Sequence, residues 1–329
     1  LTQAREISSI FIGGGTPSLL TPEQMRRLLT TVKNKGWRFT EASMEANPGT
    51  VTAEKLYVAR QLGINRISFG VQSFRPELLK TLSRIHTPEQ AVHGIELARR
   101  AGFENINLDL MYGLPAQSPA DLEQDLAIAV SLNPEHLSCY GLKVESGTGL
   151  EKQLRENTLK LPTEDMQDIM YESVPKILAA QGYVRYEISN YAKTGRECLH
   201  NMVYWRYLPY KAFGVSGCSF DGSARYTNTF DVLDYIERIK KSAAQLGERE
   251  VLPQTTQYAE YVFMNLRKTE GVSPELFKTR FGESLYKIYG AILDKYVQNK
   301  LLYKTIKGDY ALTAQGFKYS NVLFSDLLL

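Results

Sequence analysis

Four short segments carry residue types that can hold a small polar ligand. Gly13–Thr16 places three glycines before a threonine, and such a run exposes backbone N–H and C=O groups and lets a ligand approach closely. The other segments centre on Glu45, Gln72 and Asp109, each in or at the end of an otherwise apolar run. A carboxylate or amide in such a place needs a partner, such as a ribose hydroxyl or an amine. The segments therefore predict a binding site, although an ion pair with Arg66 is an alternative for Glu45.

The elements that must position these segments repeat along the first part of the chain. Each repeat is a short apolar run, a turn and a helix whose start carries a hydroxyl cap before proline, as in Thr21–Gln24 and Thr87–Gln90. The apolar runs lie at residues 9–12, 42–45, 66–69, 106–110 and 136–140. Strands joined in this way by helices pair in parallel and form a barrel or a doubly wound sheet. In both architectures ligands bind at the carboxyl ends of the strands, where all four polar segments are expected.

The pattern changes after about residue 150. Residues 163–181 are predicted as one helix and 183–188 as a strand, whereas 190–230, rich in tyrosine, glycine and asparagine, are expected to be loop-rich. Helices near 255–268, 273–280 and 284–299, a hairpin over 301–312 and a last helix capped by Thr313 follow. This order resembles a winged-helix module, for which packing or interaction is expected rather than DNA binding. We therefore expect a β/α part over 1–150, a second part over 151–250 and a small helical module over 251–329.

A second candidate constellation surrounds His200 in the loop-rich segment. Asn201, Tyr204 and Trp205 follow it closely. A neutral imidazole beside flat aromatic side chains suits the iron and the plane of a macrocycle. From these residues alone, an aromatic packing corner is the favoured interpretation and a macrocycle ligand the alternative. His136, at the start of a predicted strand, is expected to be structural.

The composition excludes several classes of protein. The chain has 329 residues, of which 43% are hydrophobic and 23% charged, the balance of an ordinary globular protein. With 39 basic and 36 acidic residues the net charge is +3, which is too small an excess of positive charge to indicate nucleic-acid binding. No apolar run is long enough for a transmembrane helix. Cys139, Cys198 and Cys218 are too widely spaced for a disulfide framework or a Cys-x-x-Cys pair, and with no signal peptide they indicate a reducing cytoplasm.

Taken together, the motifs resemble one known family. Ile12–Ser18 is similar to the glycine motif of radical S-adenosylmethionine (SAM) proteins. Glu45–Thr50, Phe69–Phe74 and Asn107–Pro115 resemble the oxygen-independent coproporphyrinogen III oxidase-like group of that family. Within the group, His200-Asn201-x-x-Tyr204-Trp205 resembles the haem-binding signature of the haem chaperone branch. The resemblance covers essentially the whole chain, and it raises the haem interpretation of His200 above the packing corner.

This resemblance implies a fold and a set of site residues. The fold is expected to be α/β, an incomplete (β/α) barrel of the radical SAM type with a smaller C-terminal α+β region that ends in a winged-helix-like module. Residues 151–250 are expected to complete the barrel and to carry the haem motif. The residues expected to contact SAM are Gly14, Gly15, Thr16, Glu45, Gln72, Arg84 and Asp109. Those expected to contact haem are His200, Asn201, Tyr204 and Trp205, with His200 as the candidate iron ligand. For Arg84 the sequence leaves an alternative, in which its Ser-Arg-Ile-His segment covers a helix end.

The chain departs from the family at the iron–sulfur cluster. In the family a Cys-x-x-x-Cys-x-x-Cys loop before the glycine motif binds three irons of a [4Fe–4S] cluster, and this chain holds no such loop. The first residue is Leu1 rather than an initiator methionine. We therefore expect that a βα unit of about 30 or more residues is missing or disordered, rather than that the protein is degenerate. The chain as given is not expected to bind the cluster or to cleave SAM. No residue is assigned a catalytic role, and whether the protein is an enzyme stays open.

The resemblance favours one function over two others. The expected function is a haem-binding chaperone on a radical SAM scaffold, which binds SAM and, in a full-length protein, a [4Fe–4S] cluster, and delivers haem to an unidentified acceptor protein in the cytoplasm. The alternative is an oxygen-independent coproporphyrinogen III oxidase, a radical SAM enzyme of porphyrin biosynthesis that catalyses an oxidative decarboxylation. A third hypothesis is a SAM-binding or interaction protein without a cluster. No nucleic-acid or integral membrane partner is expected.

Overall fold

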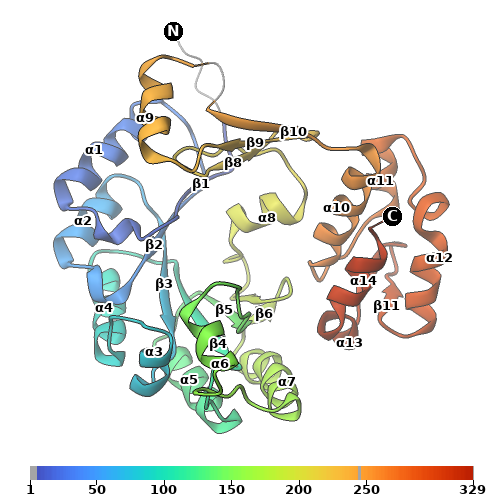
Figure 1. Cartoon of the computed structure of the whole chain (residues 1–329), viewed down its shortest axis with the longest axis horizontal. Coiled ribbons are helices and arrows are strands. Elements are labelled where there is room, and N and C mark those ends of the chain that lie inside the picture. Colours follow the sequence, from blue (N-terminus) through green and yellow to red (C-terminus); the bar gives the residue numbers. More distant parts are fainter. Residues whose placement is uncertain (1–5, 244–245, 329) are drawn as a thin grey trace. The chain divides into compact units, whose positions relative to one another are not determined.

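A seven-stranded sheet organises the first of two units, residues 1–200 (Figure 1). The structure, a computed structural model, describes residues 6–243 and 246–328. Its strands are β1 (Ser9–Ile12), β2 (Glu41–Ala46), β3 (Arg66–Gln72), β4 (Ile106–Tyr112), β5 (His136–Gly141), β6 (Val184–Arg185) and β7 (Asn190–Ala192). Their order is β1-β2-β3-β4-β5-β7-β6, with β1 to β5 parallel and the last two pairings antiparallel. The described sheet does not close, which confirms the predicted incomplete barrel.

Helices connect the strands of this unit and cover one face of its sheet (Figure 1). The helices of this unit are α1 (Pro22–Lys33), α2 (Ala53–Gln61), α3 (Pro76–Thr81), α4 (Pro88–Arg100), α5 (Pro119–Ser131), α6 (Gly149–Arg155) and α7 (Glu164–Ala180), with 3₁₀ turns at Pro17–Leu19 and Pro48–Thr50. All but α3 and α6 contribute residues to the core on the covered face. The predicted capping boxes form at Thr21 and Thr87, where each threonine accepts from the backbone N–H of the glutamine three residues on. These caps satisfy N–H groups that a helix start otherwise leaves unpaired, so each crossover begins where the sequence predicts it.

The two faces of the sheet differ in polarity, because side chains alternate between them along each strand. The face beneath the helices is apolar and includes the fully buried Ile67 and Leu108. The opposite face carries polar residues at one level across β2 to β5: Glu45, Ser68, Asn107 and His136. A row of polar side chains on four neighbouring strands cannot be satisfied by an apolar core, so this inner face is built to hold a hydrogen-bonded network or a ligand.

The second unit, residues 201–329, combines a small sheet with a helical module. The sheet has the order β10-β9-β8, with strands β8 (Cys218–Phe220), β9 (Ala224–Asn228) and β10 (Gly247–Val251), and α9 (Val232–Lys240) lies between β9 and β10 in the chain. The module comprises α10 (Gln254–Leu266), α11 (Pro274–Phe281), α12 (Leu285–Gln298), a hairpin of β11 (Leu302–Lys304) and β12 (Tyr310–Leu312), α13 (Ala314–Lys318) and α14 (Ser320–Asp326). The order of helices and hairpin agrees with the predicted winged-helix-like end. The boundaries expected at residues 150 and 250 remain predictions.

Two local predictions were wrong, whereas residues 190–230 are loop-rich as expected, with only the short elements β7, β8, β9 and the helix α8 (Leu199–Trp205) among them. The predicted strand 183–188 is short because Glu187 accepts from the backbone N–H of Ser189, at 2.6 Å, and from Asn190 Nδ2, at 2.7 Å, which turns the chain back into β7. The last helix is two helices that meet at Tyr319. Segments this short carry too few residues for a hydrophobic period to show.

Candidate functional site

The glycine loop after β1 presents its backbone to solvent at the carboxyl end of the sheet. Gly14 and Gly15 are exposed and have φ angles of +75° and +62°, and no atom lies within 4 Å of the position a Cβ would take on either. Gly13 is different, since its Cβ would lie 2.7 Å from a ring carbon of Phe11 and 3.0 Å from the Glu45 carboxyl carbon. The loop is therefore shaped by left-handed backbone at two positions and by close approach to Glu45 at a third.

Two carboxylates lie beside this loop. Burial and the charge of Asp109 raise the pKa of Glu45, while the backbone N–H of Gly14 donates to the carboxylate and lowers it. Burial also raises the pKa of Asp109, against the hydrogen bonds that it accepts, such as the one from Asn107 Nδ2 at 2.7 Å. Among the described residues Glu45 and Arg66 form no ion pair, so the structural alternative for Glu45 does not hold. Two carboxylates held at raised pKa favour a ligand that brings hydroxyl, amine or cationic groups.

Gln72 ends β3 in a strained conformation. Its φ is +68°, the pairing with β4 shifts register between Phe69 and Gln72, and its side chain is buried. The amide oxygen accepts a hydrogen bond from the Tyr140 hydroxyl at 2.9 Å. A left-handed residue other than glycine costs of order 1–3 kcal/mol, and such strain gathers at ligand sites. The backbone of Gln72 therefore supports the motif-based prediction for this residue.

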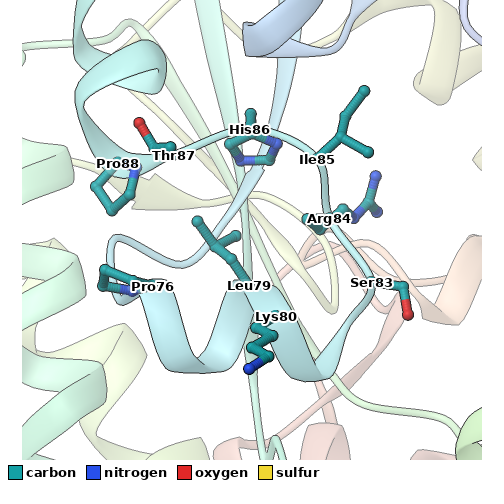
Figure 2. A pocket seen from close by; sticks show the side chains of 9 residues that line it. All are labelled: Pro76, Leu79, Lys80, Ser83, Arg84, Ile85, His86, Thr87 and Pro88. Carbon is teal, nitrogen blue, oxygen red and sulfur yellow. The ribbon is translucent and has the colours of Figure 1, made fainter.

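Arg84 lies on the loop between α3 and α4, where a hollow of about 380 Å³ opens (Figure 2). Its side chain is exposed. Burial lowers the pKa of His86, and the charge of Arg84 lowers it further. His86 is held by its Nε2, 3.0 Å from the carbonyl oxygen of Val71 at the end of β3. The loop that carries Arg84 thus lies at the same end of the sheet as Gln72. The ligand role of Arg84 remains a prediction, as does the alternative in which its segment covers the end of α3.

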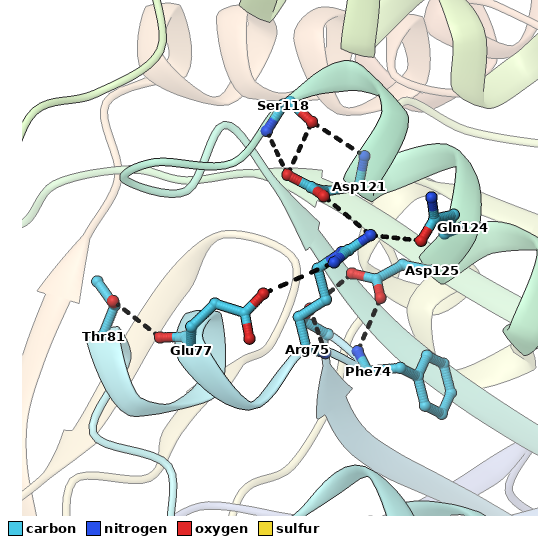
Figure 3. Close-up of polar contacts among 9 residues, drawn as sticks. Phe74, Arg75, Glu77, Thr81, Ser118, Asp121, Gln124 and Asp125 are labelled. Atoms are coloured by element: carbon cyan, nitrogen blue, oxygen red, sulfur yellow. Dashed lines mark hydrogen bonds and ion pairs between the residues drawn. The ribbon is translucent and has the colours of Figure 1, made fainter.

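A network of polar contacts fastens the turn after β3 to α5 (Figure 3). Asp125 is buried and accepts from the Ser73 hydroxyl at 2.6 Å and from the backbone N–H of Phe74 at 2.9 Å. Arg75 pairs with Asp121 at 2.9 Å and also donates to the side chain of Gln124. Because Gln72 directly precedes this turn, the network holds the strained end of β3 in place.

Replacing Asp125 with alanine is expected to lower the free energy of unfolding by about 2 kcal/mol, because the Phe74 N–H and the Ser73 hydroxyl lose a buried acceptor. Thermal unfolding followed by circular dichroism measures the loss. Glu123→Ala is the control, because Glu123 is an exposed residue of the same helix. Equal stability of the two variants would show that the Asp125 contacts do not hold the turn.

His200 lies at the other end of the strands. Its Nδ1 is 2.9 Å from the Ser9 hydroxyl, and its ring stacks on Phe11 with centroids 4.9 Å apart and an interplanar angle of 22°. Burial lowers its pKa, with the charge of Arg66 acting in the same direction and that of Glu41 against it. The imidazole is thus neutral near pH 7 and fixed by β1, rather than standing in a loop among the tyrosines that follow it.

The start of α8 is held by a buried acid that the sequence analysis missed. Glu41, at the first position of β2, is 4% exposed. Its carboxylate accepts from the backbone N–H of Leu199 at 2.9 Å, from that of His200 at 3.2 Å and from the Ser43 hydroxyl at 3.1 Å. A carboxylate at a helix N-terminus satisfies unpaired N–H groups and the helix dipole. In the sequence Glu41 directly precedes the apolar run 42–45, and nothing in that position indicates a partner.

The remaining signature residues belong to the second unit. Tyr204 makes an edge contact with Tyr210, with ring centroids 4.7 Å apart, and the Trp205 ring lies 4.3 Å from the guanidinium of Arg267. Asn201 lies in α8 with them. The structure therefore gathers the predicted SAM residues at one end of the sheet of the first unit, places His200 at the other end, and gives the aromatic residues partners within the second unit.

The part of the chain that the structure describes shows no group of side chains suited to an iron–sulfur cluster. Across residues 6–243 and 246–328 no three His, Cys, Asp or Glu side chains are grouped so as to hold a metal ion. Cys139 and Cys198 are buried, and burial raises the pKa of the Cys139 thiol well above its usual range. Thiolates hold such clusters, so the described cysteines do not fit one.

Comparison with known proteins identifies the family. Residues 1–129 match the Radical SAM superfamily, and residues 252–317 match the HemN C-terminal domain. The heme chaperone HemW of Bacillus subtilis is 36% identical over 326 residues, which are 98% of this chain and 86% of that protein. HemW of Lactococcus lactis is 36% identical over 329 residues, again 86% of its length. The chain belongs to the HemW family of radical SAM proteins.

A solved structure agrees on the fold of this HemW-family chain. Coproporphyrinogen III oxidase (HemN) of Escherichia coli has a TM-score of 0.82, covering 98% of this chain and 78% of that one, at 21% identity. At this identity the likeness shows the fold alone, and it confirms the radical SAM α/β architecture predicted from the motifs. Among the helices that the structure describes, none has the length and apolar character needed to cross a bilayer.

Proposed function

We propose that this protein is a haem-binding chaperone on a radical SAM scaffold, which takes up haem at the segment around His200 and passes it to an acceptor protein. The observation that carries the proposal is the neutral, fixed imidazole of His200 within the His-Asn-x-x-Tyr-Trp signature. The curated HemW relatives, which match almost the whole chain, bear the name heme chaperone.

The geometry around His200 suits an iron ligand. When Nδ1 carries the hydrogen and donates to the Ser9 hydroxyl, the lone pair is on Nε2, the atom that would face the iron. A metal-binding histidine commonly donates its other ring N–H to a fixed acceptor, which sets the tautomer and the ring orientation. Stacking on Phe11 restricts the ring further. Asn201, Tyr204 and Trp205 complete the proposed haem residues.

SAM is proposed to bind at the carboxyl end of the sheet. The exposed backbone of Gly14 and Gly15, with Thr16, would receive the methionine end, which carries both an ammonium and a carboxylate. The carboxylates of Glu45 and Asp109 and the amide of Gln72 suit its ammonium and sulfonium charges and its ribose hydroxyls, and Arg84 suits its carboxylate. The raised pKa of Glu45 and the strain at Gln72 support this assignment, because both are costs that a ligand can repay.

The radical SAM family also uses a [4Fe–4S] cluster. Because the described residues do not fit one, no step of the proposed function depends on it here. The alternative function, coproporphyrinogen III oxidation, draws on the fold likeness to HemN, whereas the relatives similar over nearly the whole chain are HemW proteins. The similarity therefore favours the chaperone.

A haem titration followed by visible absorption tests the proposal. We expect a saturable change in the Soret band for the wild type and for His93→Ala, a control histidine on the exposed surface of α4. His200→Ala is expected to weaken haem binding at least about tenfold, close to 1.4 kcal/mol, and to move the band. The same titration curve and spectrum for His200→Ala would remove His200 as the ligand. Absence of saturable binding to the folded wild type would reject the chaperone.

A further inference from the structure

A buried hydrogen-bonded chain crosses the inner face of the sheet from the start of α8 to Asp109. The backbone N–H of Cys198 lies 3.3 Å from the Tyr186 hydroxyl, which is 2.7 Å from His136 Nε2. On the other side of the ring, His136 Nδ1 is 2.5 Å from Asn107 Oδ1, and Asn107 Nδ2 is 2.7 Å from Asp109 Oδ1. All five residues belong to the first unit, so the chain lies within one compact body.

The orientation of the Asn107 amide sets the direction of the hydrogen bonds in this chain. Asn107 presents its NH₂ group to Asp109 and, at 2.7 Å, to Ser68, so its oxygen is the atom that accepts. His136 must then donate from Nδ1 and accept at Nε2, and the Tyr186 hydroxyl supplies that proton. The Tyr186 oxygen in turn accepts from the backbone of Cys198. Each donor therefore points toward Asp109.

Burial keeps the central histidine neutral, which this direction requires. His136 has no exposed surface and Asn107 is 1% exposed. Burial lowers the pKa of His136 well below its usual value, and the nearby charge of Arg66 acts in the same direction. A protonated ring would donate from both nitrogens and leave no acceptor for the Tyr186 hydroxyl. The chain thus persists in one tautomer at neutral pH.

The two ends of the chain reach the two proposed sites. Asp109 is one of the proposed SAM residues. Cys198 directly precedes Leu199 and His200, whose N–H groups bind Glu41 at the start of α8. Aligned hydrogen bonds strengthen one another, so greater negative charge on Asp109 strengthens each bond back to Cys198. A cationic ligand that favours ionised Asp109 therefore tightens the segment that carries His200.

We propose that Tyr186, His136 and Asn107 are positioning residues that couple Asp109 to the first turn of α8, so that SAM at one end of the sheet raises haem affinity at the other. This inference rests on the proposed function and deepens it, because it makes the two ligands interdependent. Coupling between two sites is reciprocal, so haem raises the affinity for SAM by the same factor. We expect a factor of about five, at the lower end of the usual range.

Two tyrosine-to-phenylalanine variants separate this coupling from simple packing. Tyr186→Phe removes the hydroxyl that links His136 to Cys198 and keeps the ring. Tyr183→Phe is the matched control, because Tyr183 is equally buried and donates to the Pro134 carbonyl at 2.6 Å, outside the chain. His136→Phe breaks the chain at its centre and is the second variant if Tyr186→Phe does not fold. Circular dichroism checks the fold of each.

The measurement is a haem titration with and without saturating SAM, with a SAM titration by calorimetry beside it. We expect SAM to tighten haem binding about fivefold in the wild type and Tyr183→Phe, and to change it less than about twofold in Tyr186→Phe. The Soret band of Tyr186→Phe is also expected to lose its response to SAM.

Each contrary result has a distinct meaning. Wild type that binds both ligands independently overturns the coupling but leaves the proposed function standing. Coupling retained in Tyr186→Phe, or lost equally in Tyr183→Phe, assigns it to general packing and overturns the role of the chain. If the folded wild type does not bind haem, the proposed function is overturned and this inference falls with it. If it binds haem but not SAM, the coupling alone is overturned.

Discussion

Replacing Glu41 with alanine is expected to lower the free energy of unfolding of the first unit by about 4 kcal/mol, the largest stability effect among these predictions. Its buried carboxylate accepts from two backbone N–H groups at the start of α8 and from the Ser43 hydroxyl. Alanine leaves the buried Ser43 hydroxyl and the two half-buried backbone N–H groups without this acceptor. Each buried donor left unsatisfied costs roughly 1–3 kcal/mol.

Thermal unfolding of Glu41→Ala measures this effect, with an expected fall in Tm of about 10 °C for a unit of this size. The control is Glu104→Ala, because Glu104 is exposed and lies in the loop before β4. Glu41→Gln is expected to be intermediate, since its amide keeps one acceptor oxygen and turns the other position into a donor. Wild-type stability of Glu41→Ala would mean that water or another group replaces the carboxylate.

The same variant reports on the haem segment. Glu41 accepts from the backbone N–H of His200 in the first turn of α8. In Glu41→Ala we therefore expect His200 to lose this backbone anchor, while its ring still has Ser9 and Phe11 as partners. The helix start of the signature is thus defined by a strand residue far away in the sequence. The signature motif supplies the proposed ligand residues, whereas the acid that anchors the backbone of His200 is found only in the fold.

Elements with local determinants were predictable from the sequence. Capping boxes at Thr21 and Thr87 predict the starts of α1 and α4, because each depends only on residues three positions apart. The parallel strands follow from apolar runs separated by helices, and the residues at their ends could be placed on one edge before any coordinates. The resemblance to the radical SAM family added what spacing does not provide, namely the open barrel and the proposed identity of the ligand.

Elements determined by distant contacts were not predictable. The helix α8 has seven residues, too few for a hydrophobic period to predict it. Glu41, which accepts a hydrogen bond from the start of this helix, precedes it by more than 150 residues in the sequence. The inner-face network has the same origin, since His136, Asn107 and Tyr186 come from separate strands or loops and meet only when β4 and β5 pair. A lone buried histidine in a strand was correctly expected to be structural, but its sequence neighbours do not reveal the chain it completes.

Replacing Gly14 with valine is expected to weaken SAM binding about 100-fold, a loss of about 2.7 kcal/mol, and is the largest effect on ligand affinity expected here. Gly14 has a φ of +75°, which a β-branched residue adopts only at a cost of about 1–2 kcal/mol or more. Its backbone N–H also donates to Glu45. A shift of the loop toward an allowed conformation would therefore remove the exposed backbone and release one of the two carboxylates.

The control for Gly14→Val carries the same backbone strain away from the site. Gly36, in the exposed turn after α1, has a φ of +68°, and, as at Gly14, no atom lies within 4 Å of the position of a Cβ. Gly36→Val is therefore expected to lose a similar amount of stability and to bind SAM as the wild type does in calorimetry. If both variants lose affinity equally, the effect belongs to general destabilisation. If Gly14→Val binds SAM normally, the glycine loop is a turn and not the ligand cradle, because strain at the loop then has no consequence for the ligand.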